Sequence, residues 1–158
     1  MENILLHLRV FLWTYEPEYA RNYPGFHLAA VPDSCSVLGN WLEQHRSSEL
    51  GIQRTIPLTP LRARTVPPVS GKLPCRCFIK LKLTLRPSAD DLSEMVIHSE
   101  GDHVSLEISY SRLPELIRGL RDIENGNGDY AISAKSPSDR VVHQLWFWPC
   151  HGEYWAKD

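Results

Sequence analysis

The sequence predicts an α+β fold in a single domain, with a mainly antiparallel sheet of about five or six strands and two helices packed on one face. Several segments alternate apolar and polar residues, as strands with one buried face do. Two other segments repeat apolar residues at helical spacing. A length of 158 residues with 42% hydrophobic residues suits one core, so we treat residues 1–158 as one domain.

The first elements are two strands and a helix. Residues from Ile4 to Tyr15 are rich in β-branched and aromatic side chains, and a second apolar run extends from Phe26 to Val31. A helix follows through His45. We expect Asp33 or Ser34 to cap its first turn, because a side-chain oxygen there accepts a hydrogen bond from a backbone N–H that has no partner in the helix.

Residues 47–74 show no periodicity and contain five prolines. Proline cannot donate a hydrogen bond to a sheet and disrupts a helix interior, so this region is predicted to be a Pro-rich loop. Loops of this length in compact domains are often functional.

The clearest strand runs from Cys75 to Arg86, where apolar residues alternate with mostly basic ones. Residues 95–99 and 103–110 flank a turn-prone glycine and predict a hairpin. We expect the helices to cover an apolar face made of Ile79, Leu81, Leu83, Val104, Leu106 and Ile108. We expect the opposite face to carry Lys80, Lys82, Arg86 and Glu107.

The second helix is predicted from Ser111 to Asn125, with Pro114 in its first turn and a glycine-rich end at residues 125–128. Two final strands, residues 129–133 and 141–150, complete the predicted sheet. The apolar residues of the helix form one stripe that should pack on the sheet: Leu113, Leu116, Ile117, Leu120 and Ile123.

Charge is separated into blocks although the formal net charge is only -2. Residues 51–89 carry eight Lys or Arg and no carboxylate, whereas residues 90–111 carry six carboxylates and no Lys or Arg. The basic block is either a footprint for an anionic partner or one half of a sheet whose neighbouring strand supplies the compensating acids.

A cysteine nucleophile is one candidate chemistry. Cys35 lies at the expected start of the first helix, where the helix dipole lowers the pKa of a thiol. His27 or His143 would serve as its base if the fold brought one of them near. Capping of the helix by the surrounding serines explains the same segment without catalysis, and we favour that interpretation.

A zinc site is the second candidate chemistry, because thiolates and imidazole are zinc ligands. The C-x-C spacing differs from that of common zinc sites, and adjacent strand residues point to opposite faces. We therefore expect reduced cysteines, with Cys75 and Cys77 buried, and neither a metal nor another cofactor. The residues that would form the zinc site are Cys75, Cys77, Cys150 and His151.

The C-terminal region is dense in aromatic residues, and protein interfaces are enriched in Trp and Tyr. The Pro-rich loop adds arginines that have no carboxylate near them in the sequence. The expected partner-binding residues are therefore Trp146, Trp148, Tyr154, Trp155, Arg62 and Arg64.

These patterns favour a non-enzymatic protein-binding module of the immunity or accessory type. It is expected in the cytoplasm, because neither a signal peptide nor a membrane-spanning run is found. A small hydrolase or metal-dependent enzyme that uses Cys or His is the alternative. An RNA binder acting through residues 51–86 ranks third, because the aromatic pattern of sheet-surface RNA binders is missing. We expect a protein partner and neither a membrane nor nucleic acid, and a homodimer stays open.

Overall fold

The computed structural model describes residues 4–17, 24–46, 50–60, 75–87, 94–127, 130–138 and 142–148. Within them, two α-helices accompany one mixed sheet of nine strands, which confirms the α+β class. The helices are α2 (Pro32–Gln44) and α3 (Leu113–Glu124), and short 3-10 turns form η1 (Ile4–His7) and η4 (Tyr110–Arg112). The strands are β1 (Val10–Tyr15), β2 (Phe26–Ala30), β3 (Ile52–Pro57), β4 (Cys75–Cys77), β5 (Lys80–Arg86), β6 (Met95–Glu100), β7 (His103–Ser109), β8 (Tyr130–Lys135) and β9 (Val142–Phe147).

The strands lie in the order β3-β5-β7-β6-β8-β9-β2-β1-β4. The pairs β5/β7, β6/β8 and β2/β9 are parallel, and the other pairs are antiparallel. The predicted sheet of five or six antiparallel strands is therefore wrong. Alternation identifies a strand with one buried face but not the direction of its neighbour, and two of the additional strands lie in or beside the proline-rich region.

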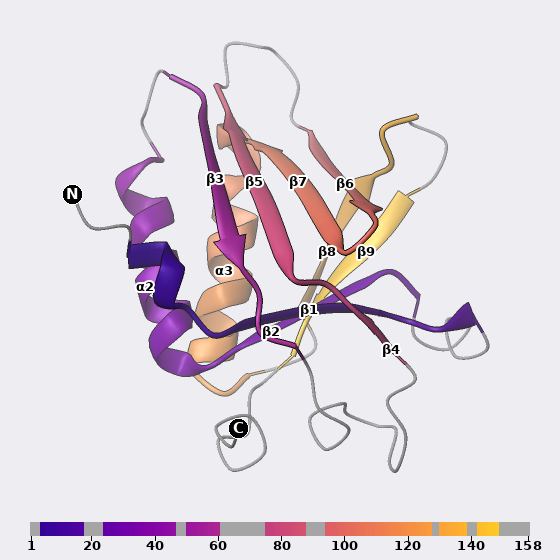
Figure 1. Ribbon diagram of the computed structural model, residues 1–158. Coiled ribbons are helices and arrows are strands. Elements are labelled where there is room, and N and C mark those ends of the chain that lie inside the picture. Colours follow the sequence, from indigo (N-terminus) through magenta and orange to yellow (C-terminus); the bar gives the residue numbers. More distant parts are fainter. Residues whose placement is uncertain are drawn as a thin grey trace.

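The sheet curls until its two ends meet. β4 is the strand at one end of the sheet, and β5 is the second strand from the opposite end. Only Phe78 and Ile79 separate these two strands along the chain. Backbone hydrogen bonds close the junction: the Phe78 N–H donates to the Leu12 carbonyl at 3.1 Å, and the Thr59 N–H donates to the Val10 carbonyl at 2.8 Å. Figure 1 shows β1 running across the ends of β3 and β5.

This junction corrects the predicted continuous strand from Cys75 to Arg86. The break at Phe78 and Ile79 reverses the alternation, so Phe78 enters the main core while Cys75 and Cys77 face the other side of the sheet. Ile79, expected in the apolar face, is 42% exposed. The remaining residues expected in that face are buried: Leu81, Leu83, Val104, Leu106 and Ile108.

Two further predictions need correction near the N-terminus. The 3-10 turn η1 replaces the first part of the strand expected from Ile4. No side chain caps α2, because the helix begins earlier than predicted, with Pro32 in its first turn and Val31 at the N-cap. The Ser34 hydroxyl instead accepts a hydrogen bond from the Arg9 N–H at 2.8 Å, which ties α2 to the start of β1.

The predicted Pro-rich loop is also wrong in part, because β3 (Ile52–Pro57) lies inside it. β3 is the end strand of the sheet and pairs only with β5 within the described residues. A proline is tolerated in such an edge strand, because one side of the strand has no ladder to interrupt. Residues 47–49 and 61–74 of the predicted loop lie outside the described residues.

The helices α2 and α3 lie side by side against one face of the sheet (Figure 1). All five residues of the predicted α3 stripe are buried there. Gly126, at φ 77°, follows α3, and the Asn127 N–H bonds back to the Asp122 carbonyl at 2.8 Å, so the glycine-rich end stops the helix as predicted. Neither α-helix in the described ranges has the length and apolar character needed to span a membrane. We call the face of the sheet turned away from α2 and α3 the open face.

Candidate functional site

The open face has a second, smaller core at the end formed by β9, β2, β1 and β4. It forms because β1 is apolar on both sides, a pattern typical of a strand buried on both faces. That pattern is the signal that could have identified Trp13, which we did not single out. We call this core the aromatic cluster, and it consists of Phe11, Trp13, Tyr15, His27, Ala29, Cys75, Cys77 and Trp148.

The aromatic cluster unites residues that the sequence assigned to three separate candidate sites. His27 was a candidate base, the cysteines of β4 were candidate metal ligands, and Trp148 was a candidate partner-binding residue. The strand pairs β9/β2, β2/β1 and β1/β4 bring their side chains to one face.

His27 is the polar centre of the cluster. It is 1% exposed and stacks between Trp13 and Trp148, whose ring centroids lie 5.6 and 5.9 Å away. Tyr15 meets the imidazole edge-on at 4.8 Å. The Trp148 indole N–H donates a hydrogen bond to His27 Nδ1 at 2.8 Å. The imidazole is therefore oriented by both stacking and hydrogen bonding.

Cys75 and Cys77 are reduced cysteines on the same face of β4, as predicted; Cys75 is buried and Cys77 is partly buried. Burial raises the pKa of the Cys75 thiol to about 12, and Cys77 and Glu16 add smaller upward contributions. Because the thiolate is the nucleophile and the metal-binding form, Cys75 is a poor candidate for both roles at neutral pH.

The raised pKa of Cys75 predicts a loss of stability at alkaline pH. An unfolded thiol ionises near its model value of 9.0, whereas the folded one holds its proton to about 12, so the fold loses stability as pH rises above 9. Between pH 8 and 10 the loss from this thiol should be about 1 kcal/mol. Cys75→Ala should remove that part of the decline in urea unfolding measurements. Equal declines in both proteins would contradict the burial of this thiol.

Of the catalytic candidates, Cys35 and His143 face the main core, whereas His27 lies on the other side of the sheet. Cys35 is buried in the main core, and its Sγ lies 3.8 Å from the Ala30 carbonyl oxygen. His27 points away from that core into the aromatic cluster, so it is not positioned to act on Cys35. His143 faces the main core, where its ring meets Phe26 edge-on at 5.5 Å.

Within the described residues, no group of three or more His, Cys, Asp or Glu side chains is arranged to hold a metal ion. Of the predicted partner-binding residues, the structure places Trp148 in the aromatic cluster and Trp146 on the neighbouring part of the open face. The Trp146 indole N–H donates to the Pro24 carbonyl at 3.1 Å. The remaining predicted site residues lie outside the described ranges: Cys150, His151, Tyr154, Trp155, Arg62 and Arg64.

The predicted basic row lies on β5 at the other side of the open face. Arg86 reaches Glu107 of β7, with a distance of 3.5 Å between guanidinium and carboxylate. Lys80 and Lys82 are exposed, and the described part of the chain gives neither of them an ion pair. Within the described residues, the acidic block therefore forms an ion pair with only one of these three cations, Arg86.

Two other acids of the block have different partners. Glu94 binds the ammonium of Lys135 on β8 at 2.9 Å, and Asp102 lies 3.0 Å from the imidazole of His103. The contact of Glu94 lies on β8, away from β5, whereas that of Asp102 involves His103, the strand partner of Lys80. Within the described residues, neither acid forms an ion pair with Lys80 or Lys82, so these exposed lysines make a positive patch on a chain of negative net charge.

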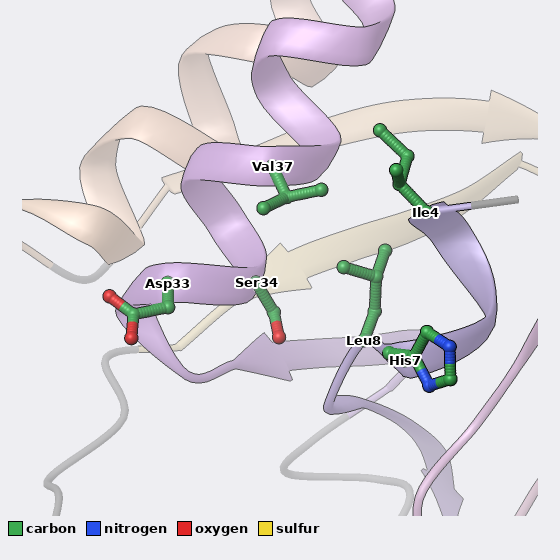
Figure 2. Close-up of a pocket in the computed structure, with 6 residues that line it drawn as sticks. All are labelled: Ile4, His7, Leu8, Asp33, Ser34 and Val37. Atoms are coloured by element: carbon green, nitrogen blue, oxygen red, sulfur yellow. The ribbon is translucent and has the colours of Figure 1, made fainter. Parts of the chain in front are cut away.

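An open hollow lies on the helix side of the molecule, between η1 and the first turns of α2 (Figure 2). Its volume is about 360 Å³, and its lining is mainly apolar, from Ile4, Leu8 and Val37. Figure 2 shows Asp33 and His7 at opposite ends of the hollow. This hollow could not be foreseen from the sequence, because the pattern from Ile4 predicts a strand where η1 turns toward α2.

Comparisons with known proteins assign no function to this arrangement. No protein-family model matches the chain, and neither a curated protein nor a solved structure was found to match it.

Proposed function

We propose that this chain is a non-enzymatic binding module whose open face receives an acidic surface of a protein partner. The observation that carries the proposal is the pair of exposed lysines, Lys80 and Lys82, which point the same way from β5 without a carboxylate from the described part of the sheet. Complementary charge steers association and selects the partner. The expected partner surface is therefore rich in Asp and Glu.

Trp146 defines the far side of the proposed surface. The strand register places it on the same face as the lysines, four strands away from β5. At a strand spacing of about 4.8 Å, this separation is about 19 Å along the sheet. Such a span suits a protein interface better than a small ligand, and aromatic anchors with surrounding charges are typical of such interfaces.

The proposal is tested by photo-crosslinking in cells that express the chain. A photoreactive amino acid replaces Ser105, which lies between the lysines and Trp146 on the open face, or the exposed Glu43 of α2 as a matched control. We expect a discrete protein adduct from the first position and none from the second. The partner peptides crosslinked at position 105 should be rich in Asp and Glu.

Charge reversal then tests the role of the lysines. Lys80→Glu with Lys82→Glu should reduce the crosslinking yield about tenfold, because favourable pairs of up to about 1 kcal/mol each become repulsive. Arg46→Glu, at an exposed cation beyond α2, should leave the yield unchanged. Equal loss in both variants, no adduct from position 105, or an adduct that nuclease removes would overturn the proposal.

A further inference from the structure

We propose that His27 is a proton-controlled latch on Trp148, closed while the imidazole is neutral and released when it takes a second proton. The latch joins β2 to the residue that follows β9. It operates inside the chain, whether or not the open face binds a partner.

The hydrogen bond between Trp148 and His27 determines the protonation state of the closed latch. An indole nitrogen donates a hydrogen bond and cannot accept one. At 2.8 Å from the indole N–H, His27 Nδ1 must therefore offer its lone pair, and the single ring proton lies on Nε2. A second proton would enter at Nδ1, so that two donors would face each other and the bond would break.

The surroundings make that second proton costly in the closed state. Within the described residues, the titratable groups that face His27 from β1 and, one strand further, from β4 are Tyr15, Cys75 and Cys77, and all three are uncharged at acidic pH. Glu16 lies beyond them, beside Cys75. The stacked indoles attract a cation, but this attraction is smaller than the cost of burying a charge and losing its hydrogen bond. The opened latch therefore takes up the proton.

Release of the latch should weaken the pairing of β2 with β9, because the latch lies at the end of that pair. β2 and β9 pair over only three residue pairs, from Phe26↔Leu145 to Leu28↔Phe147. Beyond them, the Trp148 N–H donates to the Leu28 carbonyl at 3.0 Å, and its indole adds the bond to His27. Acid therefore loosens the end of this short parallel pair.

The pH dependence of unfolding tests the latch. In this proposal the His27 imidazole stays neutral in the folded state and takes up a proton with its usual pKa in the unfolded state. The equilibrium constant for unfolding should therefore increase about 30-fold when the pH falls from 8 to 5. His27→Asn should lack this increase, because its amide oxygen can accept the indole bond without titrating. Trp148→Phe should show a smaller increase than the wild type. Trp146→Phe is the matched control and should retain the full increase, because that indole donates to a carbonyl.

Nuclear magnetic resonance of the wild-type chain tests the same latch without a substitution. At pH 7, nitrogen-15 spectra should show His27 protonated at Nε2 and unprotonated at Nδ1. The rate at which the Trp148 indole N–H exchanges with solvent through opening of the latch should increase more than tenfold, relative to the rate for Trp146, when the pH falls from 7 to 5. A proton on Nδ1 at pH 7, or equal acid dependence of unfolding in the wild type and His27→Asn, would overturn the proposal.

Discussion

Leu120→Ala is expected to lower the free energy of unfolding by about 2–5 kcal/mol. Leu120 is completely buried in the stripe of α3 that faces the sheet. The substitution removes apolar contacts and leaves a cavity that the surrounding helices and strands close only in part. Urea unfolding followed by circular dichroism reports the loss as a lower midpoint, provided that the denaturant slope is unchanged.

Leu6→Ala provides the matched control, because Leu6 lies in η1 and is 53% exposed. Its effect should stay within about 0.5 kcal/mol. A loss below about 1 kcal/mol for Leu120→Ala would show that α3 does not pack on the sheet in the way described.

Gly119→Ala is expected to destabilise the fold by about 2–3 kcal/mol, even though alanine is the better helix former. A Cβ atom at this position would lie 2.6 Å from the ring of Phe147 on β9. Phe147 is 1% exposed and is packed in the main core, where its ring also contacts Tyr130. Either α3 must move away from β9 or Phe147 must leave its preferred rotamer, and urea unfolding measures the cost.

Gly39→Ala is the matched control within the other helix. The three atoms nearest to its Cβ would belong to the guanidinium of Arg121, the first at 2.9 Å, and the end of a flexible side chain can move aside. The change should stay within about 1 kcal/mol, since the gain in helix propensity opposes the small adjustment. Adding Phe147→Leu to Gly119→Ala should recover part of the lost stability. Equal effects of the two glycine substitutions would contradict the close approach of α3 and β9.

The elements that could be predicted are those defined by a local pattern. The stripe of α3, its glycine-rich end and the hairpin of β6 and β7 all depend on residues within about one element of each other. The strand β3 and the break at Phe78 could not be predicted in the same way. Both depend on pairing with distant segments, because β3 is held by β5 and Phe78 by the backbone of Leu12.

In the candidate site, too, single residues could be predicted from local pattern, whereas their grouping depends on distant segments. Composition and spacing were enough to select His27, Trp148 and the two cysteines of β4 as unusual residues. Their grouping depends on the strand order β9-β2-β1-β4, and His27 and Trp148 are 121 residues apart in the sequence. Likewise, the acidic block could be recognised, but the contact of its Glu94 with Lys135, 41 residues away, depends on the register of the folded sheet.

The place of β9 in the sheet also determines when the molecule can finish folding. β9 is the last of the described strands to leave the ribosome, yet it lies in the middle, between β8 and β2. Until residues 142–147 have been synthesised, β8 and β2 each lack a neighbour and present an unpaired edge to other chains. The nine-stranded sheet therefore closes only after residues 142–147 have been synthesised, through a long-range pairing that slows folding and lengthens the exposure to aggregation.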